Sequence, residues 1–303
     1  MAPLAPPLVS IITATYNRSN VLRYAIESVR RSTMPDWEHL VIGDGCTDDT
    51  AEVVAGAGDP RVSFHNLPEN FGEQSAPNNA GFERARGQYV AYLNHDDLWF
   101  PDHLETLVAA IRDTGADLVY TPILALAPDG ADYLLGAVAG ERYDPAAAVP
   151  ASSWLVRREA LAELGGWRPY HRCYTYPSHD LLWRAWRAGR AIRMVPRVTV
   201  LAILSGTRAG VYATRESHEH EAIFARMGRE PGFREARLAR VAIAAAARAA
   251  AGPAGLRGLR AGLRRVLTAL DVPPSGLRLL LRYRKKGGII HDLRRRRGLG
   301  PLR

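Results

Sequence analysis

The feature that most constrains this fold is the alternation of short apolar runs with helical patterns over the first hundred residues. Four runs rich in β-branched or aromatic residues favour strands, at residues 8–14, 38–42, 62–66 and 88–93. Helical spacing separates these runs and is clearest at residues 19–31. Strands that alternate with helices form right-handed βαβ units. We therefore predict an α/β fold with a mostly parallel sheet.

One stretch, GQYVAYLNHDDLWFP at residues 87–101, places polar groups directly after a predicted strand. The strand ends in the sequence Asn-His-Asp-Asp, and ligands of open α/β sheets bind at the carboxyl ends of strands. Two carboxylates beside an amide and an imidazole suit Mg²⁺ or Mn²⁺. The structural alternative is that Asp96 and Asp97 cap a helix that begins near Trp99.

Length and composition indicate one large domain with an appendage. The chain has 303 residues, and 47% of them are hydrophobic, which is enough for a substantial core. The sequence has no apolar run of membrane-spanning length and no signal-peptide pattern at residues 1–10, so we expect a cytoplasmic protein. Cys46 and Cys173 are too few for a disulfide framework, and we expect both to be reduced.

Charge divides the chain unevenly. Residues 231–303 carry 18 Lys and Arg against 3 Asp and Glu, a net charge of +15, whereas the whole chain carries +9. The basic segment shows three helical patterns separated by Gly and Pro. We predict a first domain at residues 1–215 and a basic helical extension at 216–303, which packs on that domain, forms a homodimer, or lies on an anionic membrane surface.

Five motifs resemble those of the family 2 glycosyltransferases of the GT-A fold. They are ATYNR, GDGCTDD, NAGFERARG, YLNHDDLW, and ELGGW followed by SHD, and they span roughly residues 8–200. The resemblance implies a Rossmann-like, mostly parallel sheet flanked by helices. It also implies inverting transfer of a sugar from a nucleoside diphosphate donor.

The resemblance assigns several residues to the donor site. Tyr16 matches the aromatic residue that packs against the nucleobase, and Ala14 and Asn17 belong to the same motif. Asp44 matches the carboxylate that accepts a hydrogen bond from the base, as a uracil or thymine imide would offer. Asn79 matches an asparagine of the family motif, and we expect only a weak contact between its segment and the donor. The structural alternatives are a loop tyrosine packed on the sheet and a turn-forming aspartate.

Two positions depart from the family pattern. Gly43 stands where the family usually has an aspartate, which leaves the identity of the base open. Asn78 stands where the family often has an arginine, so one cation for the donor phosphates is absent there.

The metal motif of the family, Asp-x-Asp, reads Asn94-His95-Asp96 here. The resemblance implies that Asp96 holds Mn²⁺ or Mg²⁺ against the donor diphosphate, with Asn94 and His95 contacting the donor. Some relatives supply another ligand from a histidine-bearing loop, for which His218 and His220 are the nearest candidates. The alternative for these two histidines is a solvated helix face.

Asp180 matches the general base of the family, which takes the proton from the acceptor hydroxyl. His179 orients Asp180 or competes with it as the base. The alternative for Asp180 is an ordinary acid in the first turn of a helix. Trp99 and Trp167 are weaker acceptor-side predictions, and Trp167 is equally consistent with the core.

We therefore predict a metal-dependent inverting glycosyltransferase, bacterial by composition. Its donor is a nucleoside diphosphate sugar, with UDP or TDP favoured, and its acceptor is a hydroxyl of a glycan, lipid or small natural product. One alternative is a non-catalytic sugar-nucleotide-binding scaffold. Another is a nucleotidyltransferase, which would need a phosphate loop rich in Gly and Lys that ATYNRSN does not provide. No nucleic acid partner is expected, because the Arg-rich segment has no reading motif.

Overall fold

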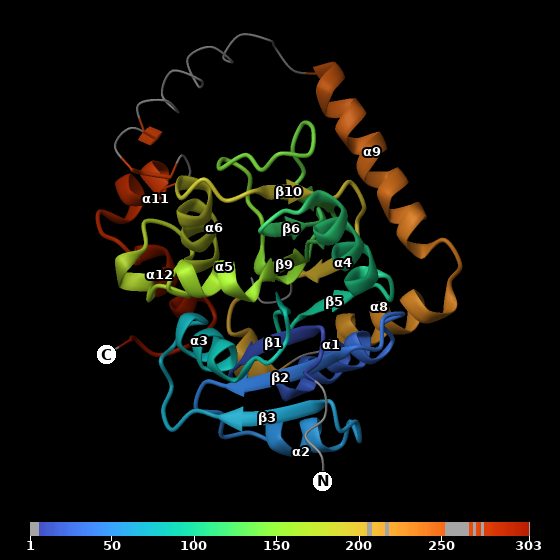
Figure 1. Ribbon diagram of the computed structural model, residues 1–303, viewed down its shortest axis with the longest axis vertical. Helices are drawn as coiled ribbons and strands as arrows, with labels where there is room; N and C mark the ends of the chain where they lie inside the picture. The colour runs from blue at the N-terminus through green and yellow to red at the C-terminus, as the bar shows by residue number, and fades with distance from the viewer. Residues whose placement is uncertain are drawn as a thin grey trace.

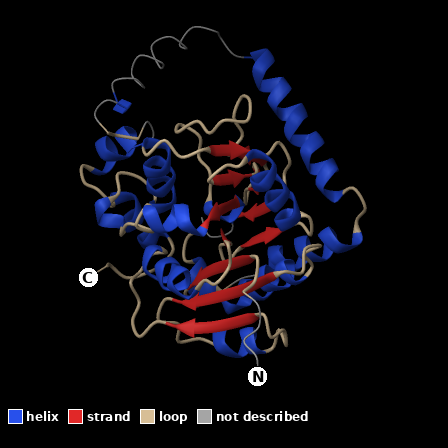
Figure 2. Cartoon of the chain, in the orientation of Figure 1, coloured by secondary structure: helices blue, strands red, loops and turns tan. Residues whose placement is uncertain are grey.

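The protein is an α/β structure with two sheets, seen in Figures 1 and 2. The computed structural model describes residues 6–204, 208–215, 218–251, 267–268, 271–273 and 276–302. The strands are β1 (Val9–Thr15), β2 (Trp37–Gly43), β3 (Val62–Asn66), β4 (Tyr89–Tyr92), β5 (Asp97–Trp99), β6 (Leu118–Tyr120), β7 (Ile123–Leu126), β8 (Asp132–Leu135), β9 (Trp154–Arg157), β10 (Ile192–Met194) and β11 (Val200–Ile203). The helices are α1 (Ser19–Arg30), α2 (Thr50–Ala55), α3 (Ser75–Arg84), α4 (His103–Thr114), α5 (Arg158–Glu163), α6 (Pro177–Arg187), α7 (Val211–Thr214), α8 (His218–Arg229), α9 (Phe233–Ala251), α11 (Gly276–Tyr283) and α12 (Gly288–Arg296), with short 3-10 helices η1 (Ala151–Ser153) and η2 (Tyr170–Arg172).

The larger sheet has the strand order β10-β6-β9-β4-β1-β2-β3. β1 pairs in parallel with β2 and β4, and β2 pairs in parallel with β3. Only β9 runs antiparallel to its neighbours in this sheet, which confirms the predicted mostly parallel arrangement. The smaller sheet has the order β5-β11-β7-β8.

Two local features differ from a simple strand-helix alternation. The apolar run at residues 116–126 forms two strands, β6 and β7, which belong to different sheets. The chain changes sheet at Thr121 and Pro122, where proline has no N–H to donate to a ladder. The helix expected to begin near Trp99 starts at His103, because residues 97–99 pair with β11 as β5.

Alternation along the central strands buries both faces of the larger sheet. In β4, Tyr92 belongs to the core on the side of α5 and α6, and Ala91 belongs to the core on the side of α1 and α4. A strand buried on both faces carries a nearly continuous apolar sequence, as residues 89–93 do.

The basic extension packs on the first domain through several of its helices. Tyr24 of α1 meets Phe224 of α8 with ring centroids 5.6 Å apart, and Arg237 of α9 pairs with Asp132 at 3.0 Å. In Figure 1, α9 and α12 lie on opposite sides of the molecule, and β2 and β3 point toward the side of α12. Among the described helices, none has the length and apolar character that crossing a membrane requires. The middle helix predicted for the extension lies mostly outside the described residues.

We expect the fold to lose stability as the solution is acidified, because two buried imidazoles are kept neutral. Burial lowers the pKa of His39 and of His103 from 6.5 to about 3 each. In the unfolded chain both would take up a proton below pH 6.5. The folded protein therefore keeps its full stability above that pH. It loses stability as the pH falls from 6.5 toward the folded-state pKa values of about 3. Each of the two histidines should lower the free energy of unfolding by about 2 kcal/mol at about pH 5, relative to its value at neutral pH.

Urea denaturation at a series of pH values measures this loss. His39→Gln should flatten the pH dependence, whereas His65→Gln, at an exposed position, should leave it unchanged. A wild-type free energy of unfolding that stays constant between about pH 7 and about pH 5 would show that these imidazoles are not buried as neutral groups.

Candidate functional site

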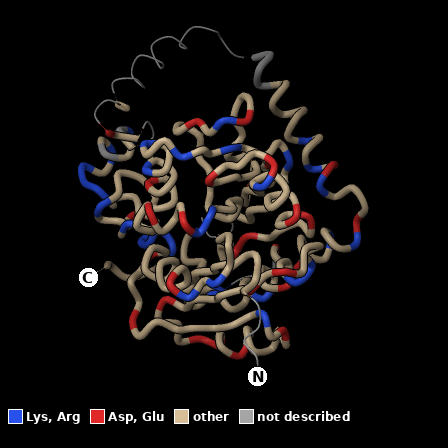
Figure 3. The backbone as a smooth tube through the Cα atoms, viewed as in Figure 1, with Lys and Arg blue, Asp and Glu red and all other residues tan. Residues whose placement is uncertain are grey.

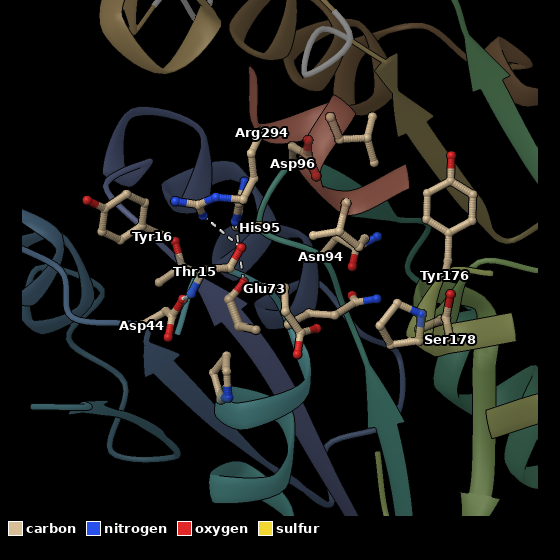
Figure 4. Close-up of a pocket in the computed structure, with 18 of the residues that line it drawn as sticks. Thr15, Tyr16, Asp44, Glu73, Asn94, His95, Asp96, Tyr176, Ser178 and Arg294 are labelled. Carbon is tan, nitrogen blue, oxygen red and sulfur yellow. Dashed lines mark hydrogen bonds between the residues drawn. The ribbon is translucent and has the colours of Figure 1, made fainter. Parts of the chain in front are cut away.

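A cavity of about 480 Å³ opens at the carboxyl edge of the larger sheet. Its walls come from the end of β1, the residue after β2, the loop before α3, the turn after β4, the first turn of α6, and α12. In Figure 4, Tyr16 and Asp44 lie on one side of the cavity and Tyr176 and Ser178 on the opposite side, with His95 and Asp96 between them. A cavity of this size suits a small organic ligand or cofactor.

Asp44 lines one end of the cavity and also orders the loop beside it. Its two carboxylate oxygens accept hydrogen bonds from the main-chain N–H groups of Phe71 and Gly72, at 2.9 and 2.8 Å. Burial raises the pKa of Asp44, and these two N–H groups oppose that rise. The carboxylate therefore links the end of β2 to the loop that precedes α3.

Position 43 has little room for a side chain, which explains why a glycine stands there. A Cβ atom there would lie 2.3 Å from Oδ1 of Asn66. The Asn66 amide exchanges two hydrogen bonds of 2.8 Å with the main chain of Cys46. An aspartate cannot enter this position without breaking that contact.

The turn after β4 is held from both sides. Asn94 donates to Asp97 at 2.9 Å, and its main-chain N–H donates to Ser152 at 3.0 Å. His95 Nδ1 lies 3.3 Å from the carbonyl oxygen of Ala14. These contacts fix Asn94, His95 and Asp96 on the cavity wall, next to the end of β1.

Asp96 is surrounded by basic side chains. Burial opposes its ionisation, but His95, Arg297 and the other neighbouring basic groups outweigh burial and lower the pKa of Asp96. One of these groups is Arg18, which is 1% exposed and donates to the carbonyl oxygen of Val211 at 2.9 Å. Asp96 is therefore ionised. Arg297 and Arg18 are the charged groups among these neighbours at neutral pH, because burial lowers the pKa of His95 to about 4 and also lowers that of His220.

His220 does not lie on a solvated helix face. It is 1% exposed, and its Nε2 lies 3.0 Å from the main-chain oxygen of Asp96. It therefore supports the turn after β4 through the backbone rather than through the carboxylate. The side chain of His218 lies outside the described residues.

The residues present fit a divalent cation through one carboxylate. Within the described ranges, no group of three or more His, Cys, Asp or Glu could hold a metal ion. Mg²⁺ in enzymes is commonly held by one or two carboxylates together with substrate phosphates and water. Asp96 can fill that role only in the presence of a phosphate-bearing ligand.

Two further titratable groups line the cavity. Burial lowers the pKa of His179 to about 4, so its imidazole is neutral near pH 7. Burial raises the pKa of Glu73 to about 7, although its carboxylate accepts hydrogen bonds from the N–H and the hydroxyl of Ser75.

Asp180 does not line the cavity, although residues 176–179 do. Its carboxylate accepts a hydrogen bond from Nε of Arg184 at 2.8 Å, one turn later in α6. The guanidinium of Arg184 also donates to the carbonyl oxygens of Leu164 and Gly166. The structure thus places Asp180 in an ion pair that fixes the loop after α5, directly after the cavity-lining residues 176–179.

Two predicted donor contacts are structural instead. Asn17 has a φ of 48°, and its side-chain oxygen accepts from the N–H of Thr47 at 2.8 Å. Asn79 exchanges hydrogen bonds of 2.9 and 2.8 Å with the main chain of Trp167. Neither residue lines the cavity. The Asn17 amide joins two loops, and the Asn79 amide joins α3 to the loop after α5.

The two predicted acceptor-side tryptophans are core residues, each 2% exposed. Trp99 donates from its indole N–H to the carbonyl oxygen of Ser152 at 2.7 Å. Trp167 stacks on Trp154 with centroids 5.9 Å apart and planes inclined at 14°. Neither ring has an open face for a sugar, which corrects both expectations.

Several cavity residues were not predicted from the sequence. They are Glu73, Tyr176, Ser178, Tyr212, Arg294 and Arg297. Ser178 belongs to the SHD motif, and the four-arginine run at residues 294–297 was also visible, but neither signal indicated that these residues would line the cavity.

Comparison with known proteins agrees with this architecture. The family model described as glycosyl transferase family 2 matches residues 10–165, just over half of the chain. The "putative teichuronic acid biosynthesis glycosyltransferase TuaG" of Bacillus subtilis is 35% identical over 126 residues, 41% of this chain and 50% of that protein. The chondroitin synthase of Pasteurella multocida is 36% identical over 127 residues, 41% of this chain and 13% of that protein. The chain thus spans half the length of the first relative and much less of the second.

Solved structures share the fold. Residues 1–349 of S. aureus TarS in complex with UDP-GlcNAc superpose with a TM-score of 0.57 at 17% sequence identity. The match covers 72% of this chain and 66% of that one. At this identity the likeness establishes the GT-A type of fold.

We expect Asp180→Asn to destabilise the protein, because it leaves a guanidinium that is 11% exposed without its carboxylate. The free energy of unfolding should fall by about 2 to 4 kcal/mol in urea denaturation. Asp113→Asn, at an exposed position of α4, is the matched control and should change little. Unchanged stability in Asp180→Asn would show that the ion pair with Arg184 does not hold the loop after α5.

Proposed function

Because the chain belongs to glycosyl transferase family 2, we propose that it transfers a sugar from a nucleoside diphosphate donor to a hydroxyl of a glycan, lipid or small molecule. The observation that carries this proposal is the single cavity that brings together Tyr16, Asp44, Asp96 and the first turn of α6. An aromatic ring and a carboxylate at one end suit a nucleobase, and Asp96 in the middle suits the phosphates.

The donor base is uracil or thymine in this proposal. Each offers an imide N–H, for which the Asp44 carboxylate is an acceptor, and Tyr16 supplies a face for stacking. The capture of UDP-GlcNAc and UDP by TarS in its crystal structures supports UDP as the first donor nucleotide to test.

Mn²⁺ or Mg²⁺ would be held by Asp96 together with the donor phosphates. The ion would neutralise charge that grows on the departing diphosphate. Asn94 and His95 hold the turn that carries Asp96, and Asp97 supports Asn94 from within the protein.

The proton of the acceptor hydroxyl passes to His179 in this proposal. Its imidazole lines the cavity and is neutral near pH 7 because burial lowers its pKa to about 4. That basicity is similar to the basicity of an ordinary carboxylate, and a proton becomes acidic as its oxygen bonds to the anomeric carbon. Attack by the acceptor in line with the leaving diphosphate inverts the anomeric centre.

We expect one nucleoside diphosphate to raise the melting temperature of the wild type, because a ligand that binds only the native state stabilises it. UDP, TDP, GDP and CDP should be compared with and without Mn²⁺ or Mg²⁺. The metal-dependent part of the shift should be lost in Asp96→Asn and kept in Asp113→Asn. If none of the four nucleotides raises the melting temperature of the wild type, the donor proposal fails. A non-catalytic scaffold of the same fold is then favoured.

We expect His179→Gln to slow transfer by about 10²- to 10⁴-fold while nucleotide affinity stays unchanged, because only proton transfer is lost. Glu73→Gln is the parallel variant, since burial raises the pKa of this cavity carboxyl group to about 7. Transfer that survives in His179→Gln and disappears in Glu73→Gln would move the role of proton acceptor to Glu73.

A further inference from the structure

Among the residues that the structure describes, acidic side chains outnumber Lys and Arg in the cavity, although a ligand that carries phosphates needs cations. Three carboxylates line it, those of Asp44, Glu73 and Asp96. Among the described lining residues, the only Lys or Arg side chains are Arg294 and Arg297, and both come from the C-terminal segment. The loop before α3, at residues 67–74, contains neither Lys nor Arg. A diphosphate in this cavity therefore depends on α12 for cationic side chains.

The segment that carries these arginines is fixed to the first domain at three places. The N–H of Gly287, just before α12, donates to the carbonyl oxygen of Cys173 at 3.0 Å. The carbonyl oxygen of Arg296 accepts from the N–H of Gly210 at 3.0 Å. Arg294 Nη1 donates to the carbonyl oxygen of Gly72 at 2.7 Å, in the loop that Asp44 orders.

Gly72 shows how closely the C-terminal segment lies on that loop. Its φ is 81°, and a Cβ atom there would collide with Leu302 and with the guanidinium of Arg294. The contact joins residues more than two hundred positions apart. A loop on the cavity wall and the C-terminal segment thus form one surface.

The two guanidinium groups lie near different residues of the cavity wall. Burial raises the pKa of Asp44, at the end assigned to the base, and the charge of Arg294 opposes that rise. The guanidinium carbon of Arg297 lies 5.8 Å from the ring centre of Tyr212, which also lines the cavity. Figure 4 places Arg294 between Tyr16 and Asp96. The diphosphate of a donor whose base stacks on Tyr16 would cross this interval.

We propose that Arg294 and Arg297 bind the diphosphate of the donor, so that α12 completes the donor site. This inference rests on the proposed function and gives part of the basic extension a role in the reaction. α12 lies outside residues 10–165, so the arginines belong to a segment that the family model does not cover.

Arginine is suited to this role by its geometry. Its planar guanidinium donates paired hydrogen bonds to phosphate oxygens and remains charged at every relevant pH. Cations aimed at the leaving diphosphate stabilise charge that increases as the glycosidic bond breaks. They would share this task with a cation at Asp96.

The test compares a nucleoside diphosphate with its own nucleoside. Isothermal titration calorimetry would use whichever of UDP, TDP, GDP or CDP binds the wild type, with and without Mg²⁺. We expect Arg294→Gln and Arg297→Gln each to weaken diphosphate binding by about 10- to 100-fold and to leave nucleoside binding within about twofold of the wild type. Arg297→Lys should recover part of the loss, because it restores the charge without the fork.

Arg295→Gln is the matched control. It removes the same charge from the same helix, but its side chain is 80% exposed and pairs with Asp292. It should leave the affinities for both ligands unchanged. Thermal melts of all variants show whether α12 remains folded onto the domain.

The outcomes separate this inference from the function on which it rests. A wild type that binds one diphosphate, with Arg294→Gln and Arg297→Gln binding it equally well, would overturn the role of α12 and leave the transferase proposal standing. An equal loss of nucleoside and diphosphate binding would also overturn it, since the arginines would then only hold the cavity together. A wild type that binds none of the diphosphates would remove the proposed function itself.

Discussion

The parallel pairing of β1 with β2 and β4 is the constraint on which the site depends. Thr15 pairs with Gly43, and Ile12 pairs with Tyr92, so the three strands end at one edge of the sheet. Parallel strands buried on both faces cannot shift register without moving apolar side chains out of the core. The residues that follow them are therefore held together, and a single cavity receives side chains from three separate parts of the chain.

This constraint explains which cavity residues could be predicted from the sequence. Tyr16, Asp44 and Asp96 follow strand ends, and the alternation of strands and helices is visible in the sequence. Asp180 lies within a helix, where successive residues are rotated by about 100°. The sequence predicted the helix, but not which side of its first turn faces the cavity. The contact of Asp180 with Arg184, and the position of His179 on the cavity wall, depend on that rotation.

Burial was equally difficult to predict for tryptophan, which combines a large apolar ring with a polar N–H group. Trp99 and Trp167 have faces that suit a sugar, yet packing decides whether those faces are open. Trp167 is covered because Trp154 of the neighbouring strand stacks on it, a contact that no local pattern encodes. Gly43 is a parallel case, since the side chain that excludes an aspartate there belongs to Asn66 of β3.

The two oppositely charged parts of the chain contact each other in the structure. The extension is strongly basic and the remainder is net acidic, and Figure 3 shows Lys and Arg along the segment of α11 and α12. Arg294 and Arg297 of this segment lie on a cavity that also holds Asp44, Glu73 and Asp96. Opposite charges that are partly shielded from water attract strongly, so docking of α12 and ionisation of the cavity carboxylates favour each other. Packing on the first domain, a homodimer and a membrane surface are the three alternatives that the composition leaves open, and the extension directs part of its charge toward its own domain.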